Sequence, residues 1–245
     1  MTRRVALINN GSQYAGPALA REYARRGHDL VLAMPADGLV DELEGLGATV
    51  EVVPGRIDIS EPGHAQQLVD AALARFGRID SAVMFSGRII IGRFTNSTVE
   101  QLDDIVHTCL HAPYEFLKAV VPPMVEAKSG QVLVITSAAG ARPTPGAPLY
   151  SSVRAGATMM AKNVADEVAS TGVQVNACGT NFMDFPEFRK AAGADDPERR
   201  KFIESQVPMG RLGTMEEFAA FCMAFLDGSS QFTTGQYVAY AGGWA

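Results

Sequence analysis

The feature that most constrains the fold of this chain is the alternation of short apolar runs with longer segments of helical periodicity along its whole length. The apolar runs, such as 132–135, are continuous and rich in valine, isoleucine and leucine. Runs of this kind are typical of strands in a parallel sheet that is covered on both faces. The alternation therefore predicts a doubly wound α/β fold, in which helices connect parallel strands.

The expected elements fill one domain. Strands are predicted over 5–8, 30–34, 50–53, 81–85, 131–136, 174–178 and 237–240, and helices over 16–27, 38–47, 62–76, 98–127, 150–170 and 215–227. This set describes a single-domain, Rossmann-like, doubly wound parallel sheet of about seven strands flanked by helices. No linker divides the 245 residues, so we expect one domain over 1–245. The least regular segment, 180–210, is expected to be an insertion that covers a ligand at the carboxyl ends of the strands.

The composition limits the classes of partner and the cellular compartment that we expect for this chain. A formal net charge of −6 argues against nucleic acid or an acidic membrane surface as a partner, and no run approaches the ~18 apolar residues of a membrane span. The three cysteines, Cys109, Cys178 and Cys222, lie in apolar surroundings and predict buried free thiols in a reducing, cytoplasmic compartment. His107 and His111 share a helix face without a visible third ligand, so no metal site is expected.

Ser137, Tyr150 and Arg154 form the set of residues that carries most of the predicted chemistry. Ser137 ends a predicted strand, Tyr150 begins the next helix, and Arg154 follows one helical turn later on the same face. A free tyrosine, with a pKa of about 10, is a poor base at neutral pH, but a cation about 4 Å away favours its phenolate form. Tyrosine and arginine at this spacing are common on helices, and the serine makes the set specific. It predicts a site that moves a proton on or off an alcohol oxygen.

Further positions carry a family resemblance. Together with Asn176 and the glycine-containing runs 234–236 and 242–243, the Ser/Tyr/cation set resembles the short-chain dehydrogenase/reductase superfamily over essentially the whole chain. That superfamily has a lysine four residues after the tyrosine, where this chain has Arg154, and the two cations differ in shape and hydrogen bonding. A Ser, Tyr and Arg spaced S-x12-Y-x3-R are similar to the halohydrin dehalogenase branch of the superfamily.

The turn after the first predicted strand departs from the superfamily's nucleotide-binding pattern, Thr-Gly-x3-Gly-x-Gly. The corresponding positions are Asn9, Asn10, Tyr14 and Gly16, so only the last glycine remains. Tyr14 would project a ring into the groove where a dinucleotide lies. The dehalogenase branch has T-x4-[F/Y]-x-G in this turn, which Tyr14 and Gly16 match. Asn9 replaces its threonine, and a short polar side chain there can still cap the turn.

Three further positions depart from the nucleotide-binding members of the superfamily. Their Asn-Asn-Ala-Gly motif corresponds to 84–87, which keeps only the glycine, and the helix asparagine of their proton relay aligns with Cys109. Met34 ends the second predicted strand where an acidic residue would bind the ribose, although Asp58 after the third strand is retained. Four such losses around one ligand predict that the chain binds no cofactor.

The resemblance implies a halide pocket in place of the cofactor. The segment 179–183 is similar to the dehalogenase halide loop, in which backbone amides and apolar side chains surround a small anion. An aromatic-rich loop also fits ordinary packing. The halide or nucleophile pocket is assigned to Tyr14, Asn181, Phe182 and Met183. The substrate pocket is assigned to Phe85, Pro143, Leu149 and Phe185.

These expectations combine into one predicted activity, a cofactor-independent carbon–halide lyase of the halohydrin dehalogenase type. Tyr150 would take the proton of a vicinal haloalcohol held by Ser137, an epoxide would close, and halide would leave. The reverse reaction would open an epoxide with azide, cyanide or nitrite. The partners implied are a haloalcohol or epoxide, a small anion, and further copies of the chain in a homodimer or homotetramer. Two alternatives stay open: an NAD(P)-dependent short-chain reductase with a degenerate fingerprint, and a non-catalytic relative.

Overall fold

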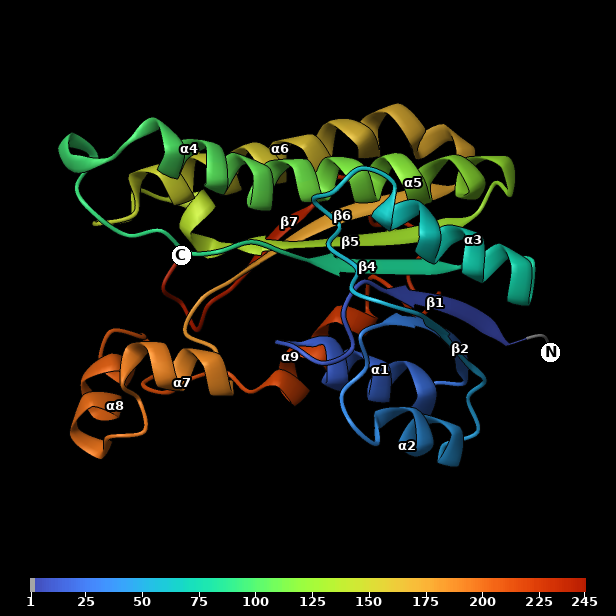
Figure 1. The fold of residues 1–245 in the computed structure, drawn as a ribbon, viewed down its shortest axis with the longest axis horizontal. Coiled ribbons are helices and arrows are strands. Elements are labelled where there is room, and N and C mark those ends of the chain that lie inside the picture. Colours follow the sequence, from blue (N-terminus) through green and yellow to red (C-terminus); the bar gives the residue numbers. More distant parts are fainter. Residues whose placement is uncertain (1–2) are drawn as a thin grey trace.

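Residues 3–245 are described by a computed structural model, in which seven parallel strands form one sheet with helices on both faces (Figure 1). The strand order is β3-β2-β1-β4-β5-β6-β7. The strands are β1 (Arg4–Ile8), β2 (His28–Ala33), β3 (Val50–Val53), β4 (Ser81–Phe85), β5 (Gly130–Ser137), β6 (Val173–Thr180) and β7 (Tyr237–Tyr240). The helices are α1 (Gly16–Arg25), α2 (Leu39–Gly45), α3 (His64–Phe76), α4 (Val99–Val106), α5 (Ala112–Glu126), α6 (Pro148–Val168), α7 (Pro186–Ala192), α8 (Pro197–Glu204) and α9 (Met215–Met223). The predicted single-domain, Rossmann-like, doubly wound sheet is confirmed.

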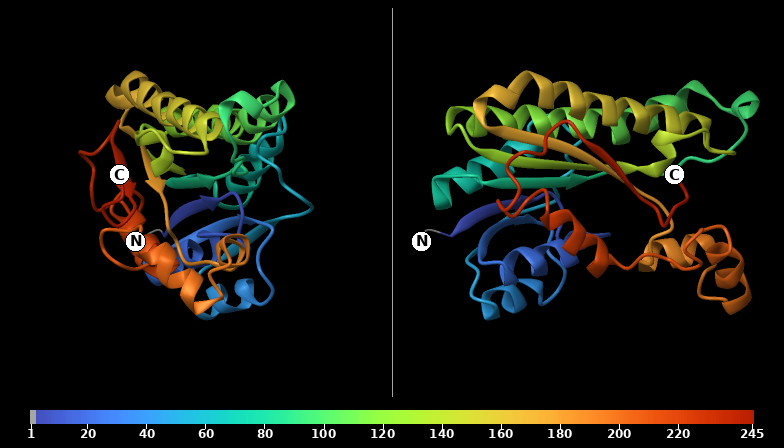
Figure 2. Two further views of the ribbon diagram at one scale, coloured as in Figure 1. Left: turned by 90° about the vertical axis from the view of Figure 1, so that its left-hand side faces the viewer. Right: turned by 180° about the vertical axis from the view of Figure 1, so that it is seen from behind.

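Two layers of helices bury opposite faces of the sheet (Figures 1 and 2). On one face, Leu68 of α3 and Phe116 of α5 pack in the same core as Val132 of β5. On the other face, Phe218 of α9 packs in a core with Leu133, the next residue of β5. Because successive side chains of a strand point to opposite faces, the continuous apolar run of β5 supplies both cores.

The helix predicted over 98–127 is interrupted. The structure has α4, then a π-helical turn over His107–His111, then α5. Pro113 lies in the first turn of α5 and has no N–H to bond to the carbonyl four residues earlier, so the regular helical ladder is broken at this point. The π-helical turn contains the fully buried Cys109. Such turns insert one extra residue into a helix and often occur at functional sites.

Two strands extend beyond their predicted ends. β5 and β6 run to Ser137 and Thr180, which lie opposite each other as paired residues. The next helix, α6, begins at Pro148, whose fixed φ suits the first turn of a helix. Tyr150 therefore lies in the first turn of α6, just after the strand that carries Ser137. These local features bring the serine and the tyrosine to the same edge of the sheet.

The irregular segment 180–210 contains α7 and α8, which project from one end of the molecule (Figures 1 and 2). The Asp184 carboxylate accepts hydrogen bonds from Arg189 of α7 at 2.9 Å and from Arg200 of α8 at 2.7 Å. Both helices are thus tied to the loop that leaves β6, at the carboxyl end of the sheet.

The structure also shows the state of the cysteines, the character of the helices and the grouping of metal-ligating side chains. Cys109, Cys178 and Cys222 are free and buried, as predicted. Within residues 3–245, no helix combines the length and apolar character needed to cross a membrane. The same part of the chain holds no cluster of three metal-ligating side chains.

Candidate active site

Ser137 lies at the carboxyl end of β5 with its hydroxyl fixed by the backbone. Its Oγ accepts a hydrogen bond from the Ala139 amide at 3.2 Å and donates to the Thr180 carbonyl at 3.4 Å. The side chain is only 6% exposed. The hydroxyl therefore has a defined position at the edge of the sheet, from which it can hold an oxygen atom of a bound molecule.

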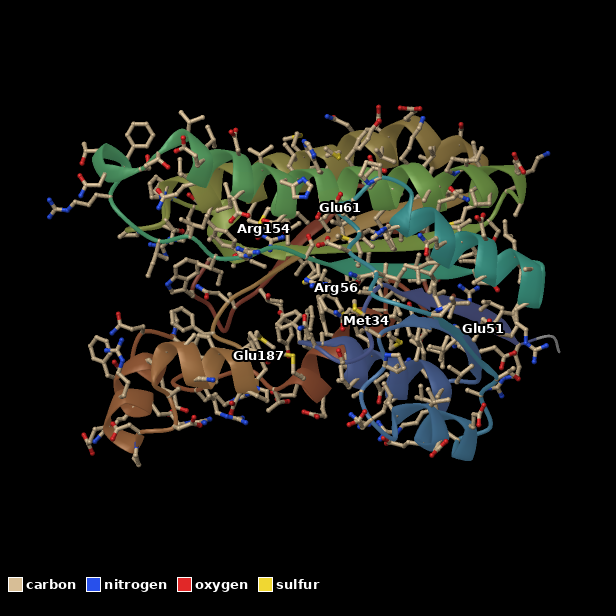
Figure 3. All side chains as sticks on the ribbon, in the orientation of Figure 1. Met34, Glu51, Arg56, Glu61, Arg154 and Glu187 are labelled. Carbon is tan, nitrogen blue, oxygen red and sulfur yellow. The ribbon has the colours of Figure 1, made fainter. Side chains whose placement is uncertain are left out.

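Tyr150 and Arg154 lie next to each other on the first turns of α6. Both are buried, and the Arg154 Cζ atom lies 5.1 Å from the centre of the Tyr150 ring. Burial opposes the charge of Arg154, but the groups packed around it, Tyr150 first among them, outweigh this and raise the pKa of the guanidinium above its ordinary value. Tyr150 also packs in one apolar cluster with Ala139, two residues after Ser137. Figure 3 shows Arg154 between the α4–α6 layer and the sheet.

The three predicted catalytic residues therefore come from β5 and α6 and lie at the carboxyl edge of the sheet. A permanently charged cation beside a phenol can stabilise negative charge that develops on the phenol oxygen during proton transfer. A neighbouring hydroxyl can orient the oxygen atom that exchanges the proton. The catalytic roles of Ser137, Tyr150 and Arg154 remain predictions, and the arrangement suits general acid–base chemistry.

Tyr14 occupies the crevice at the carboxyl ends of β1, β4 and β6. Its Oη lies 2.6 Å from Thr180 Oγ1. Its ring makes edge contacts with Phe85 and Phe185, whose ring centres lie 5.5 and 5.0 Å away. Burial raises the pKa of the Tyr14 hydroxyl well above its usual range, so this phenol is neutral. Its backbone has a φ of +48°, which is uncommon for a residue with a side chain.

The other residues assigned to a halide pocket lie in different surroundings. The Asn181 side chain accepts a hydrogen bond from the Phe182 amide at 2.9 Å, so that amide is already paired. Phe182 packs against Trp244, 5.8 Å between ring centres, and against the cluster around α8. Met183 is buried in the same core against which the Tyr14 ring packs. The structure thus brings Tyr14 and Met183 to one core and turns Phe182 toward α8.

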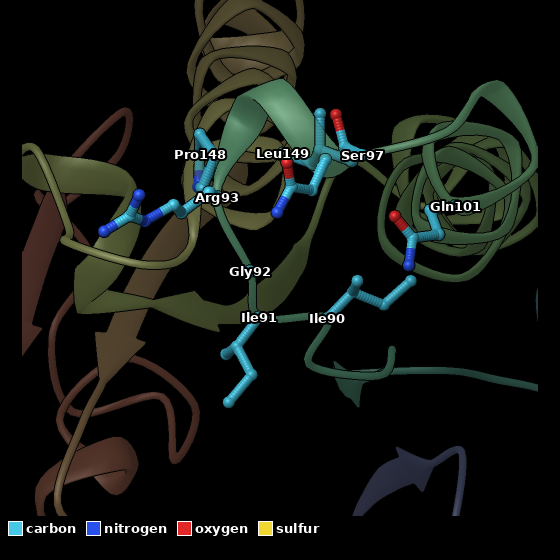
Figure 4. Close-up of a pocket in the computed structure, with 9 residues that line it drawn as sticks. Ile90, Ile91, Gly92, Arg93, Ser97, Gln101, Pro148 and Leu149 are labelled. Carbon is cyan, nitrogen blue, oxygen red and sulfur yellow. The ribbon is translucent and has the colours of Figure 1, made fainter.

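The residues assigned to a substrate pocket also separate. Phe85 and Phe185 surround Tyr14, whereas Pro143 is exposed in the loop before α6. Leu149 lines a cleft of about 240 Å³ whose other walls include Ile90. Figure 4 shows this cleft between the segment 90–97 and the start of α6.

This cleft lies beside the cluster that contains Tyr150. Ile90 and Leu149 both pack against the cluster that contains Tyr150. Arg93 and Gln101 add polar groups to the lining. Sequence reasoning assigned only Leu149 of this lining, although the apolar run 89–91 in an otherwise polar connection was a visible signal.

Backbone amides of the turn after β1 are hydrogen-bonded within the turn. The Asn10 side chain accepts hydrogen bonds from the amides of Ser12 at 2.9 Å and Gln13 at 3.0 Å. A Cβ atom on Gly16 would lie 2.0 Å from the Asn10 carbonyl oxygen, which explains why this glycine is kept. The expectation that Asn9 caps this turn is wrong: its carboxamide instead bonds both the amide and the carbonyl of Phe85, joining β1 to β4.

Met34 and Asp58 lie at two outer positions of the nucleotide groove of the superfamily. Met34 follows β2 with a φ of +46°, and Figure 3 shows it away from Arg154, toward the α1–α2 side. The Asp58 carboxylate accepts hydrogen bonds from the amide and hydroxyl of Ser60, the hydroxyl at 2.6 Å. The hydroxyl bond contributes most to lowering the pKa of Asp58 below its ordinary value. This carboxylate is therefore already engaged by its own loop.

Comparisons with known proteins relate the whole chain to reductases and dehydrogenases. Residues 15–245 match the family described as enoyl-(acyl carrier protein) reductase. The chain is 27% identical over 245 residues to a 3-oxoacyl-[acyl-carrier-protein] reductase of Thermotoga maritima, covering 98% of this chain and 97% of that protein. It is 27% identical over 246 residues to a 2,5-dichloro-2,5-cyclohexadiene-1,4-diol dehydrogenase of Sphingobium indicum, covering 99% and 96%.

Solved structures share the fold. A short-chain type dehydrogenase/reductase from Mycobacterium ulcerans has a TM-score of 0.89 at 24% identity, covering 98% of this chain and 89% of that one. A structure described as ElxO with NADP bound has a TM-score of 0.87 at 20% identity, covering 99% of both chains. At these identities the likeness shows the arrangement of the elements and no more.

The predicted carbon–halide lyase activity is contradicted by these comparisons. The relatives are reductases or dehydrogenases by name, and two neighbouring structures are described with NADP or NADPH bound. The prediction of a lyase or dehalogenase is therefore wrong, and no comparison supports a haloalcohol or an epoxide as the substrate. The error came from giving two local departures, Arg154 and Tyr14, more weight than the likeness of the whole chain to oxidoreductases.

The relatives imply a nicotinamide dinucleotide, and its fit depends on the residues at the carboxyl ends of the strands. Ligands of open α/β sheets bind in the crevice beyond the carboxyl ends of the strands. The Tyr14 ring fills that crevice between Phe85 and Phe185, and the amides of the preceding turn are bonded to Asn10. In this conformation the residues do not fit the nicotinamide half of such a cofactor. A nicotinamide could enter only after Tyr14 leaves Thr180.

Proposed function

Because this chain belongs to the short-chain dehydrogenase/reductase superfamily, in the family described as enoyl-(acyl carrier protein) reductase, we propose that it is an oxidoreductase acting on an alcohol or carbonyl oxygen. The observation that carries the proposal is the stacking of the Arg154 guanidinium on Tyr150 in the same apolar cluster as the end of β5. This arrangement serves proton exchange with an oxygen atom, which every interconversion of an alcohol and a carbonyl requires.

Each residue has one role in this proposal. Ser137 binds the substrate oxygen through its hydroxyl, which the Ala139 amide already orients. Tyr150 donates a proton to that oxygen in the direction of reduction and removes it in the direction of oxidation. The hydride that balances either direction would be supplied or accepted by a nicotinamide nucleotide, which would require Tyr14 to leave Thr180. Arg154 stabilises the phenolate that remains after donation. The cleft lined by Ile90 and Leu149 is the proposed place for the apolar body of the substrate.

A second candidate is favoured by the position of Tyr14. Its ring lies where a nicotinamide would have to enter, and its hydroxyl is bonded to Thr180. With that ring in place, Tyr150 could still exchange a proton with a bound hydroxyl group in a reaction that transfers no hydride. Both candidates use the same Ser137 and Tyr150, and they differ only in their need for a nucleotide.

The experiment that separates them adds the nucleotide as a variable. A 3-oxoacyl thioester and a set of cyclic secondary alcohols are incubated with the protein plus NADPH, NADH, NADP+ or NAD+, or with no nucleotide, and products are measured by mass spectrometry. Product that forms only with a nucleotide supports the oxidoreductase. Product of any kind without one supports the second candidate, and a Tyr14→Gly variant shows whether removing the ring restores dependence on the nucleotide. No product under all conditions would contradict both for these substrate classes.

A further inference from the structure

Hydrogen bonds alone do not hold the Arg154 guanidinium in place. One nitrogen, Nη2, donates to the Ser86 carbonyl, and the Nε atom has no hydrogen-bond partner among residues 3–245. An arginine side chain has many rotamers, and fixing it over Tyr150 has a cost in side-chain entropy. One hydrogen bond from a charged group returns a similar amount of free energy, so it leaves little surplus to fix the orientation of the guanidinium. The side chain is only 5% exposed, so its position depends on what packs around it.

Gly87 forms one wall of the space around the guanidinium. A Cβ atom at this position would lie 2.3 Å from Cys109 Sγ and 2.8 Å from Arg154 Nη2. The residue also has a φ of +98°, in the region that favours glycine. Gly140 packs against the backbone end of the same residue, where a Cβ atom would lie 2.9 Å from the Arg154 carbonyl carbon. Any side chain at Gly87 must therefore displace the thiol, the guanidinium or both.

Cys109 forms the adjoining wall. It is fully buried in the π-helical turn, and its Sγ lies 3.7 Å from the Arg88 carbonyl oxygen. A thiol packs as a small apolar group and accepts hydrogen bonds weakly. It therefore fills the space beside Gly87 without offering the guanidinium a strong alternative acceptor. A carboxamide in the same place would be larger and would offer an oxygen atom to the unpaired Nε.

We propose that Gly87 and Cys109 are positioning residues, which together form a slot that holds the Arg154 guanidinium over the Tyr150 ring. They act on proton transfer only through Arg154 and touch no substrate. The slot accommodates the arginine because, beside the glycine that the superfamily shares, a thiol in place of the larger asparagine leaves room for a planar cation that is larger than an ammonium group. The inference takes its catalytic meaning from the proposed function, but its test does not depend on the substrate.

The test measures the ionisation of Tyr150 directly. The near-ultraviolet absorbance of phenolate is followed against pH, and the curve of a Tyr150→Phe protein is subtracted to isolate this residue. In Gly87→Ala and in Cys109→Asn, the pH at which the Tyr150 phenolate forms should rise by about one unit, which corresponds to a tenfold change in the ionisation equilibrium. Where turnover is measurable, kcat should fall about tenfold with little change in KM, because the substrate contacts are intact.

Two matched variants control for loss of structure. Gly77→Ala places a side chain at a φ of +71° in open space, so it carries the backbone strain of the glycine replacement without the clash. Cys109→Ser keeps about the size of the thiol, and its hydroxyl can donate to the Arg88 carbonyl as the thiol does, so this variant should keep the wild-type titration. In an Arg154→Met background, Gly87→Ala should no longer move the Tyr150 phenolate, because the cation through which it acts is gone.

The outcomes distinguish this inference from the proposed function. Equal titrations for wild type, Gly87→Ala and Cys109→Asn would overturn the positioning role, whatever the enzyme catalyses. A Gly77→Ala shift as large as that of Gly87→Ala would overturn it as well. A shift confined to the slot variants supports the inference even in a protein that converts none of the substrates tested, and in that case only the proposed oxidoreductase fails.

Discussion

The two ends of the crevice above the sheet differ in how completely their polar side chains are hydrogen-bonded. At the β5–α6 end, Ser137, Tyr150 and Arg154 are buried. The Ser137 hydroxyl makes two long hydrogen bonds of 3.2 and 3.4 Å, and the Arg154 Nε atom has no partner among residues 3–245. At the β1–α1 end, Asn9, Asn10 and Tyr14 are engaged by other groups of the protein. Unsatisfied polar groups are retained where chemistry needs them, and satisfied groups stabilise the fold.

This comparison has a direct consequence for mutation. Substitutions at the β5–α6 end should lower the reaction rate with little loss of stability. Substitutions at the β1–α1 end should lower the free energy of unfolding, because they remove packing and hydrogen bonds from the core. The predictions below test this division, beginning with the largest effect.

Tyr14→Gly should have the largest effect on stability. Removing an aromatic side chain from a core costs about 3–5 kcal/mol of unfolding free energy. Relief of the positive φ should return about 1 kcal/mol. Denaturant unfolding measures the change, and Tyr14→Phe is the matched control, since it removes only the bond to Thr180 and should cost about 1 kcal/mol. A Tyr14→Gly protein as stable as wild type would mean that this ring is not part of the core.

Ser137→Ala should show the opposite pattern. Loss of a hydroxyl that positions the reacting oxygen should lower kcat about 100-fold, as for other oriented donors in active sites. The free energy of unfolding should change by less than about 1 kcal/mol, because the Ala139 amide loses only one 3.2 Å bond. The two quantities are measured on the same preparation. A large loss of stability with unchanged kcat would reverse the comparison at this end.

Asn9→Ala tests the link between β1 and β4. The Asn9 carboxamide satisfies both the amide and the carbonyl of Phe85, and this site is buried. Leaving these groups without partners should cost about 2 kcal/mol of unfolding free energy. Asn9→Asp is the informative companion, since it keeps the acceptor for the Phe85 amide but loses the donor for its carbonyl. An unchanged unfolding midpoint in Asn9→Ala would show that water replaces the carboxamide.

The smallest predicted effect lies on α9, which supports the β1–α1 end through Phe218, whose ring centre lies 6.4 Å from that of Tyr14. Hydrogen bonding to Arg211 is the main cause that lowers the pKa of Glu217 to about 2. A carboxyl whose folded pKa is depressed stabilises the fold above its unfolded value, about 4.3, and loses that contribution as the pH falls toward about 2. Because the pair is exposed, the effect should be small and should weaken with salt.

Glu217→Gln measures the contribution of the Glu217–Arg211 ion pair to the free energy of unfolding. The free energy of unfolding of wild type should fall more steeply than that of the variant between about pH 4.5 and 2, and the two curves should converge at high salt. Parallel curves over this range would show that the ion pair with Arg211 does not stabilise the native state.

The sequence predicted the sheet well because the signals are local. The apolar runs at 50–53, 81–85 and 237–240 match β3, β4 and β7 residue for residue. The break in the helix over 98–127 was missed because His107–His111 has ordinary helical propensities, and its π-helical turn depends on tertiary packing around Cys109. The sequence predicts an irregular segment over 180–210 with a helix-like, Arg-rich part, and it does not define α7 and α8 separately, because the contacts that fix these helices run through Asp184.

The site was predicted in part. The Ser, Tyr and Arg set follows from spacing along two elements that the sequence defines clearly. The position of Phe182 could not be read from sequence, because the backbone of this residue has a φ of +54° and sends its ring toward Trp244, at the far end of the chain. The hydrogen bonds of Asn9 were equally hidden, since their partner lies on β4, 76 residues later.

The most direct test of this account compares the wild type with Tyr150→Phe for any substrate that the wild type converts, with and without nucleotide. Phenylalanine keeps the packing of the ring and removes only the group that carries the proton. The account predicts that the rate falls by at least about 100-fold, while the fold and the unfolding midpoint are retained. Equal rates for the two proteins would contradict proton transfer by Tyr150, and with it the central role given to this end of the crevice.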